Sequence, residues 1–242
     1  MFDLKEFENP VEHFYVLKKW DWDYLEAERF QQECVLYVNE NPHTSILIIC
    51  SHASCFTMGR GLQKLKEDVG VQLVDFDTNM NLIYPLHSIK RGGGLTFHYP
   101  GQFVFYPIIN LTYHKIGVHD FMFMIMDVTK SLLEEMFNLH SFKIRNDLLG
   151  LWFDNDFHQA KVASIGFAVS KFNTYHGMAL NLLNDPEMFR ALLGLYPCGI
   201  SGDTYLDIES IYQKELTTDD RELFFEKFKK EIVLKLSNLK TI

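Results

Sequence analysis

Short apolar runs of strand length recur along the chain, and they constrain its fold more than any other feature. Gly, Asn, Asp or charged residues bound these runs, which cover residues 45–50, 82–86, 103–111, 151–153, 162–169 and 178–183. Helical patterns separate them at about 22–39, 117–138 and 218–238, without the regular βαβ alternation of a doubly wound sheet. The pattern predicts an α+β fold, in which a mixed sheet is flanked by helices.

The rest of the chain indicates one catalytic domain over residues 1–242. There is no internal repeat, low-complexity tract or linker, and 47% hydrophobic residues can fill one sizeable core. Asp185-Pro186 predicts the start of a short helix that ends near Gly194. In the last helix an apolar stripe predicts a core-facing side, made by Leu223, Phe224, Phe228, Ile232 and Leu236.

The charge of the chain limits its partners. A formal net charge of −9 argues against a general nucleic-acid binder, which presents a basic surface to phosphates. No segment approaches the roughly 18 consecutive apolar residues of a membrane span, and residues 1–14 do not resemble a signal peptide. We expect a cytoplasmic protein with no membrane or nucleic-acid partner.

The cysteines and histidines do not form a metal-binding pattern. The four cysteines have neither CxxC spacing nor the density of a disulfide scaffold, so they predict free thiols in a reducing compartment: Cys34, Cys50, Cys55 and Cys198. The chain has no HExxH and no Cys/His pair at ligand spacing, and it has no GxSxG elbow of a serine hydrolase. We expect neither a metal nor a cofactor.

Three segments carry residues suited to chemistry. In RGGGLTFHYPGQ, residues 91–102, the glycines allow a backbone to approach a ligand, although a structural turn also explains them. Lys161 begins the apolar run AKVASIGFAVS, where a solvated side chain is the simpler interpretation. Cys198 lies in the constrained turn Pro-Cys-Gly, so it is either a nucleophile or a structural thiol. A nearby cation would lower the pKa of a nucleophilic thiol, and the candidates are Lys161, His98 and His176.

In this order, the segments FTMGR, RGGGLTFHYPGQ, KVASIG, HGMALN and PCG resemble the lipoyl(octanoyl) transferase family, formerly called lipoate-protein ligase B. The resemblance covers about residues 45–205. It implies a fold similar to the catalytic domain of the biotin and lipoate ligases. It also implies transfer of octanoyl from octanoyl-acyl carrier protein to a lysine of lipoyl domains, in 2-oxoacid dehydrogenase complexes and the glycine cleavage H protein.

The resemblance also implies roles for particular residues. Cys198 would carry the acyl thioester, and Lys161 would lower its pKa and move the proton. The substrate site would be lined by Arg91, Gly92, Gly93, Gly94, Leu95, Thr96, Phe97, His98, Ser164, Ile165, Gly166, His176, Gly177, Met178 and Ala179. Two departures are Tyr99, where the family usually has Gly, and Ser51, where an acidic residue commonly precedes the histidine. We expect the bulk of Tyr99 to narrow the acyl tunnel or reshape partner docking.

Three other functions share parts of this pattern. An ATP-dependent lipoate-protein ligase of the same superfamily also has a glycine-rich loop, but it needs no nucleophilic cysteine. An amidotransferase that passes octanoyl between lipoyl domains differs in its donor. A non-catalytic binding protein would not need both Cys198 and Lys161.

Overall fold

The computed structural model describes residues 3–60, 82–155, 159–193, 195, 197 and 200–239. Within this part of the chain, eight strands form one sheet in the order β1-β2-β3-β7-β11-β10-β9-β8. All neighbours in it are antiparallel except β2 and β3. The strands are β1 (Glu8–Val11), β2 (Phe14–Trp22), β3 (Ser45–His52), β7 (Gln102–Ile108), β8 (Phe142–Arg145), β9 (Gly150–Asp154), β10 (Gln159–Ser170) and β11 (Asn173–Asn181).

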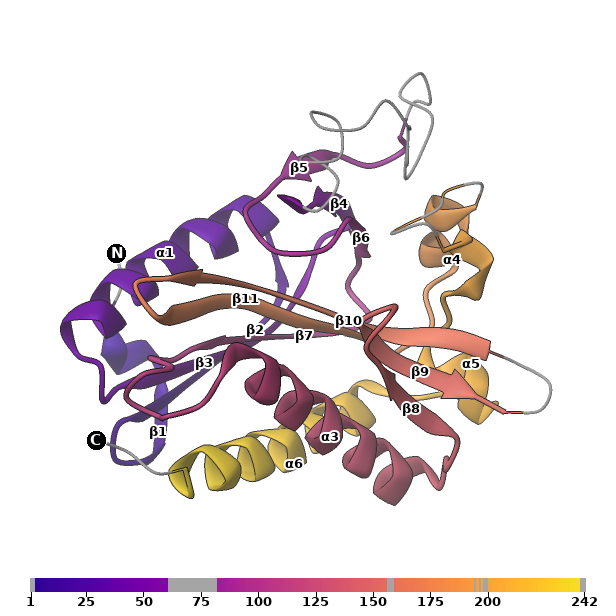
Figure 1. Cartoon of the computed structure of the whole chain (residues 1–242). Coiled ribbons are helices and arrows are strands. Elements are labelled where there is room, and N and C mark those ends of the chain that lie inside the picture. The colour runs from indigo at the N-terminus through magenta and orange to yellow at the C-terminus, as the bar shows by residue number, and fades with distance from the viewer. Residues whose placement is uncertain are drawn as a thin grey trace.

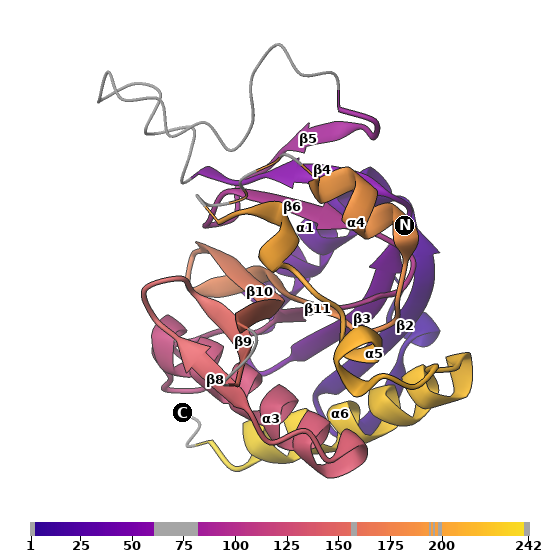
Figure 2. The same cartoon turned by 90° about the vertical axis from the view of Figure 1, so that its right-hand side faces the viewer.

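Helices cover both faces of this sheet (Figures 1 and 2). Helix α1 (Tyr24–Glu40) packs on one face, where the core includes Ile46, Val104 and Ala179. Helices α3 (Val118–Phe137) and α6 (Thr218–Ser237) pack on the other face, over the larger core. The predicted mixed sheet with flanking helices is therefore confirmed.

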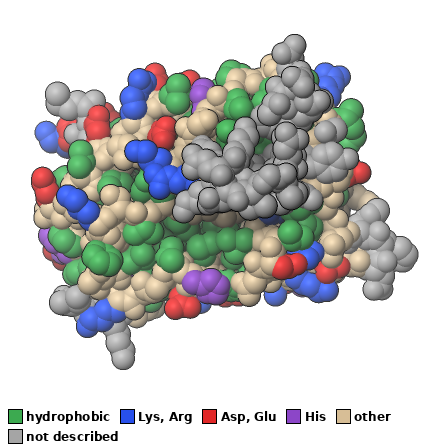
Figure 3. Space-filling model, turned by 45° about the horizontal axis from the view of Figure 1, so that its top comes forward, with side chains coloured by type: hydrophobic (Ala, Val, Ile, Leu, Met, Phe, Trp, Pro, Cys, Tyr) green, Lys and Arg blue, Asp and Glu red, His purple; other side chains and the backbone are tan. Residues whose placement is uncertain are grey.

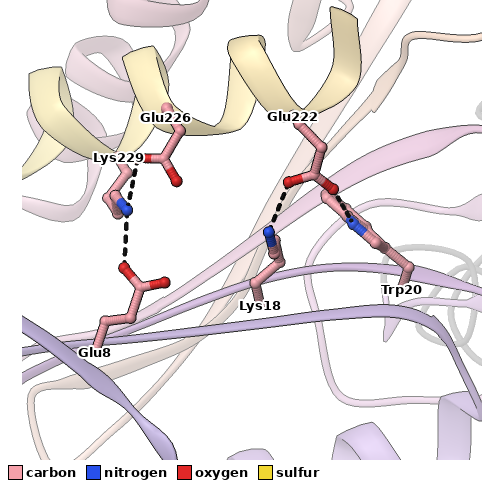
Figure 4. A network of polar contacts seen from close by, with 6 residues as sticks. All are labelled: Glu8, Lys18, Trp20, Glu222, Glu226 and Lys229. Atoms are coloured by element: carbon pink, nitrogen blue, oxygen red, sulfur yellow. Dashed lines mark hydrogen bonds and ion pairs between the residues drawn. The ribbon is translucent and has the colours of Figure 1, made fainter. Parts of the chain in front are cut away.

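Polar contacts fix α6 against the first two strands (Figure 4). Glu222 accepts hydrogen bonds from Lys18 Nζ at 2.6 Å and from Trp20 Nε1 at 2.7 Å, both on β2. Lys229 forms ion pairs with Glu8 of β1 and with Glu226 of its own helix. The helix is thus held by its buried phenylalanines on one side and by these contacts along its edge.

A second, smaller sheet lies beside the first, with the strand order β5-β4-β6. Its strands are β4 (Cys55–Met58), β5 (Leu86–Ser88) and β6 (Leu95–His98). Helix α4 (Pro186–Leu192) packs on it through a third cluster that includes Phe97, Tyr99 and Met188. Two short helical elements follow, η3 (Gly202–Thr204) and α5 (Ile208–Tyr212), and η1 (Leu4–Glu6) precedes β1.

The edge of β10 matters for the site. Strand β9 pairs with β10 only as far as Ser164, so in the described part of the chain no strand flanks residues 165–170 on that side. Instead, the backbone N–H of Gly92 donates to the Phe167 carbonyl at 3.1 Å. The glycine-rich loop therefore takes the place of a strand at this edge.

Most predicted elements are confirmed, with three corrections. Residues 82–85 are not in a strand: Pro85 has no N–H for a ladder, and β5 begins only at Leu86. Strand β11 begins at Asn173, five residues before the predicted start. Leu223 does not belong to the buried stripe of α6, because half of its surface is exposed. Asp185 caps α4 as predicted, and Gly194 lies outside the described residues.

Candidate active site

A cavity of about 440 Å³ opens between the glycine-rich loop and strands β10 and β11. It reaches both faces of the large sheet, since Tyr24 of α1 and Met122 of α3 both line it. The segments singled out in the sequence meet here, and they contribute Arg91, Gly92, Gly93, Gly94, Thr96, His98, Lys161, Ser164, Ile165, Gly166, His176, Gly177, Met178 and Ala179. Apolar side chains form a band across the face that carries the small sheet (Figure 3).

The Arg91 side chain organises the glycine-rich loop. Its Nη2 donates to the Thr57 carbonyl at 3.1 Å, to Thr57 Oγ1 at 2.9 Å and to Thr96 Oγ1 at 2.7 Å. Its Nη1 donates to the Gly92 carbonyl at 2.9 Å. The guanidinium therefore joins the loop to β4 and β6 while it lines the cavity.

The loop rests directly on β10 at Gly166. A Cβ on Gly166 would lie 2.8 Å from the Gly92 carbonyl oxygen, so only glycine allows this approach without a shift. Gly166 is paired with Gly177 of β11. Removing side chains from both positions keeps this part of the sheet thin where the cavity lies against it.

Lys161 is buried, with 4% of its surface exposed, although its position in the sequence favoured a solvated side chain. The interpretation as a solvated lysine is therefore wrong. Its ammonium nitrogen lies 5.8 Å from the Trp152 ring centroid and 6.0 Å from that of Tyr205. Gly150, with φ +153°, makes room for it, because a Cβ there would lie 2.7 Å from Lys161 Cε.

The histidines beside the cavity are neutral near pH 7. Burial lowers the pKa of His52 to about 4 and that of His176 to about 3, where Arg91 adds a smaller contribution. Burial lowers the pKa of His98 well below its ordinary value, and electrostatic interactions with His52 and Arg91 act in the same direction. Neutral rings can donate one hydrogen bond and accept another, as His52 and His98 do, so these two order the site without adding charge. In the described part of the chain neither ring nitrogen of His176 has a hydrogen-bond partner.

Two predicted site residues, Leu95 and Phe97, and the family departure Tyr99 do not line this cavity. Leu95 and Phe97 alternate with Thr96 and His98 on β6, so their side chains point into the cluster beneath α4. Tyr99 is fully buried in the same cluster, where it stacks on Phe97 and donates to the Leu183 carbonyl at 3.2 Å. It therefore does not narrow the cavity.

Ser51, the other departure, is joined to a carboxylate from the neighbouring strand. Its hydroxyl donates to Asp21 Oδ1 at 3.0 Å and accepts from the Asp21 N–H at 2.8 Å. The next residue, His52, has Nδ1 2.9 Å from the Trp22 carbonyl and Nε2 2.8 Å from the Tyr106 hydroxyl. The position before this histidine is thus still associated with an acidic group, the Asp21 carboxylate of β2.

The described cysteines are core residues. Cys34, Cys50 and Cys55 are free and buried, and burial raises the pKa of the Cys55 thiol to about 12. Cys198 and Gly199 lie outside the described residues. Ile200, which follows them, lines the cavity, and the carbonyl of Pro197, which precedes them, accepts a hydrogen bond from the Tyr205 hydroxyl at 3.1 Å.

Several cavity residues were missed by sequence reasoning. Tyr24 stacks on His98, and Tyr106 and Val104 come from the middle of β7. Val118 and Met122 come from the first turns of α3. None of them stands in a motif. Only the start of a helix or the apolar alternation of a strand marks them.

Acidic protein partners of a chain with net charge −9 predict a local basic patch, and its candidates near the site in the sequence serve different purposes: Lys90, Arg91, Lys143, Arg145 and Lys171. Lys143 pairs with Asp154, and Arg145 pairs with Asp147. Lys90 and Lys171 are exposed. Lys143 and Arg145 are paired with carboxylates, so not all of the candidates contribute to the expected basic surface.

The chain matches the model of the lipoyl protein ligase A/B catalytic domain over residues 23–233. It belongs to this family, as the motifs indicated.

Among curated relatives, it is 31% identical over 238 residues to a chloroplastic octanoyltransferase of Arabidopsis thaliana, covering 90% of this chain and 78% of the relative. It is 32% identical over 179 residues to an octanoyltransferase of a Nostoc species, covering 74% of this chain and 73% of that one. The chain is thus an acyltransferase.

Solved structures share the fold at low identity. A Plasmodium falciparum LipL1 in complex with lipoate has a TM-score of 0.58 at 14% identity, over 94% of this chain and 65% of that one. A lipoate-protein ligase A bound with ATP has a TM-score of 0.54 at 11% identity, over 90% and 84%. The expected similarity to the lipoate ligase fold is confirmed.

The described residues lack two further features. No helix there is both long enough and apolar enough to cross a membrane. No three His, Cys, Asp or Glu side chains come together there as a site that could hold a metal ion.

Proposed function

We propose that this octanoyltransferase works through a thioester on Cys198, with octanoyl-acyl carrier protein as donor and a lysine of a lipoyl domain as acceptor. The observation that carries the proposal is the buried Lys161 in a cavity built from the motif segments. The residues that flank Cys198-Gly199 in the sequence support it, since Ile200 lines the same cavity and Pro197 is bonded to Tyr205.

The other thiols support the assignment of Cys198 by contrast. Burial raises the pKa of Cys34, Cys50 and Cys55, so these thiols resist forming the thiolate that attacks a thioester. None of the three lines the cavity. Of the four cysteines in the sequence, Cys198 is the one within a motif of the family.

In the first half of the reaction, Lys161 takes the proton of the Cys198 thiol, and the thiolate attacks the octanoyl carbonyl carbon. A new carbon–sulfur bond forms, and the bond to the pantetheine sulfur breaks. The Lys161 ammonium then returns the proton to the departing thiolate. The products are octanoyl-Cys198 and free acyl carrier protein.

In the second half, the acceptor lysine attacks octanoyl-Cys198 as the neutral amine. Its nitrogen forms the amide bond while the bond to Cys198 sulfur breaks, and Lys161 carries the proton from nitrogen to sulfur. Conversion of a thioester to an amide is downhill, so no ATP is needed. The acceptors are lipoyl domains of 2-oxoacid dehydrogenase complexes and the glycine cleavage H protein.

The cavity fits an acyl chain better than a polar ligand along most of its length. Its walls include Ile165, Phe167 and Met178 on β10 and β11. We assign the octanoyl chain to this cavity. A cytoplasmic location stays a prediction from the sequence, because one relative is chloroplastic.

The experiment is intact-protein mass spectrometry after mixing the enzyme with octanoyl-acyl carrier protein without ATP. We expect an octanoyl adduct on the wild type that hydroxylamine removes. In Cys198→Ser the adduct should be absent or resist mild hydroxylamine as an oxygen ester, and in Lys161→Ala it should form slowly. Cys55→Ser is the matched control, and it should form the adduct as the wild type does.

The proposal fails if the wild type forms no adduct and instead transfers free octanoate only with ATP, since that is ligase behaviour. An adduct formed from an octanoylated lipoyl domain, but not from octanoyl-acyl carrier protein, would instead identify an amidotransferase.

A further inference from the structure

A chain of buried hydrogen bonds starts at the cavity and runs through three motif segments. Arg91 Nη2 donates to Thr57 Oγ1 at 2.9 Å, and Thr57 Oγ1 lies 3.2 Å from His98 Nε2. His98 Nδ1 lies 2.7 Å from Gln102 Oε1. Gln102 Nε2 donates to Asn181 Oδ1 at 3.0 Å and to the Phe97 carbonyl at 3.1 Å.

From Asn181 the chain continues to the backbone of Lys161. Asn181 Nδ2 donates to the Leu206 carbonyl at 3.3 Å, and the Leu206 N–H lies 3.4 Å from the Lys161 carbonyl as its donor. Lys161 and Tyr205 also form a parallel β-bridge. The network therefore ends on the segment that lies beside both Lys161 and Pro197.

Each link has only one possible donor direction. The Phe97 carbonyl only accepts, so the Gln102 amide faces it with Nε2 and turns Oε1 toward His98 Nδ1. His98 Nδ1 therefore donates, and in a neutral ring Nε2 must accept the hydrogen of the Thr57 hydroxyl. Gln102 Nε2 also donates to Asn181 Oδ1, which leaves Asn181 Nδ2 to donate to Leu206.

The network is buried throughout, which makes a fault in any link costly. Thr57 and Gln102 are at most 1% exposed, and His98 and Asn181 are less than 10% exposed. An unmatched polar group away from water is expensive, so the side chains move to restore pairing instead of leaving it open. A change at Gln102 is therefore transmitted to Leu206 and to the Lys161 backbone.

We propose that Gln102 and Asn181 are positioning residues for Lys161, which act by holding the segment of Tyr205 and Leu206 against it. Neither side chain lines the large cavity, so neither touches the acyl chain there. The inference rests on the proposed role of Lys161 in proton transfer.

The test uses two substitutions that preserve size and replace an amide nitrogen by oxygen. In Gln102→Glu an acceptor faces Asn181 Oδ1 and the Phe97 carbonyl, and in Asn181→Asp an acceptor faces the Leu206 carbonyl. Displacement of a reacting group by up to about 1 Å costs up to about 100-fold in rate. We expect kcat for octanoyl transfer to fall about tenfold to 100-fold, with KM for octanoyl-acyl carrier protein changed less than about twofold.

The kcat is expressed per site that forms the octanoyl thioester, so that an unfolded fraction does not contribute. A pH series from 6 to 9 adds a second readout for Gln102→Glu. When the new carboxyl is protonated, its hydroxyl donates to Asn181 Oδ1 and restores the link. The loss of kcat in Gln102→Glu, relative to the wild type, should therefore become smaller as the pH falls. General structural damage does not produce this pH dependence.

The matched control is Asn110→Asp. Asn110 is a buried amide outside the network, and it donates to Asn173 Oδ1 at 2.8 Å. This variant suffers the same chemical change, and it should keep the wild-type kcat per site. Asn181→Asp provides an independent measurement if Gln102→Glu cannot be purified.

Wild-type kcat per site and a flat pH ratio in both variants, beside a slowed Lys161→Ala, would overturn this inference and leave the proposed function intact. Wild-type kcat in Lys161→Ala would overturn the proposed role of Lys161 and this inference with it.

Discussion

Substitution of Gly166 by alanine tests whether the glycine-rich loop must rest on β10. The new Cβ would lie 2.8 Å from the Gly92 carbonyl oxygen and 3.4 Å from the Gly92 carbonyl carbon. The obstacle is backbone, so it cannot turn aside as a side chain can. Reaching an ordinary contact of roughly 3.4 Å requires a shift of about 0.6 Å. That shift would stretch the 3.1 Å bond from Gly92 N–H to the Phe167 carbonyl beyond hydrogen-bonding distance.

Overpacking of this kind costs about 1–3 kcal/mol of stability. For a domain of this size it lowers Tm by about 2–12 °C. Because a misplacement of about 1 Å costs about 100-fold in rate, a shift of half that size should slow octanoyl-thioester formation about tenfold. Rapid-quench mass spectrometry measures the rate, and differential scanning calorimetry measures Tm.

Gly117→Ala is the control, because a Cβ there would meet only Asp120 Oδ2, at 3.4 Å. It should change Tm and rate little. If Gly166→Ala forms the thioester at the wild-type rate with an unchanged Tm, then the loop does not depend on this contact and the reasoning is refuted.

Tyr99→Phe should lower stability by about 1 kcal/mol, because it removes the hydrogen bond to the Leu183 carbonyl. Tyr99→Ala should lower it by about 3–5 kcal/mol, because it leaves a cavity. Neither variant should alter the preference for acyl-chain length. Urea titration and a series of acyl donors would check this, and altered length preference would contradict it. Stability should also fall below about pH 6.5, because unfolded His52 and His176 take up protons there while the folded rings, with pKa about 4 and 3, do not. Each histidine contributes up to about 1.4 kcal/mol to the free energy of unfolding per pH unit, and urea titrations from pH 8 to 4.5 would measure this. If the free energy of unfolding falls equally steeply with pH in the wild type and in His52→Gln, the reasoning is refuted.

Sequence patterns identified the elements in which burial imposes a regular pattern of apolar residues. Strand β3 reads as a continuous apolar run because both of its faces are buried. Strand β1 is exposed along its whole length, and in β2 the apolar residues 14–17 are interrupted by Lys18 and Lys19, so neither strand was predicted. These strands form through pairing with their neighbours and with α6, which no local window contains.

The motifs located the loop and strands of the site but not the direction of each side chain. Leu95 and Phe97 stand in a motif, yet the alternation of β6 turns them away from the cavity. The burial of Lys161 depends on Gly150, a residue in another strand. The contributions of Tyr24 and Met122 depend on helices packed from opposite faces, which local sequence does not specify.

The short pairing of β9 leaves half of β10 with an open strand edge, and the glycine-rich loop covers part of it through the bond from Gly92 to Phe167. The Thr174 N–H of β11 donates to the Ile109 carbonyl, on the side away from β10. Val169 of β10 is paired with Thr174, so its own N–H and carbonyl point away from β11, toward the open edge. An uncovered edge of this kind is a template for pairing between molecules. The loop that shapes the active site therefore also occupies one position of a strand edge at which another molecule could otherwise pair.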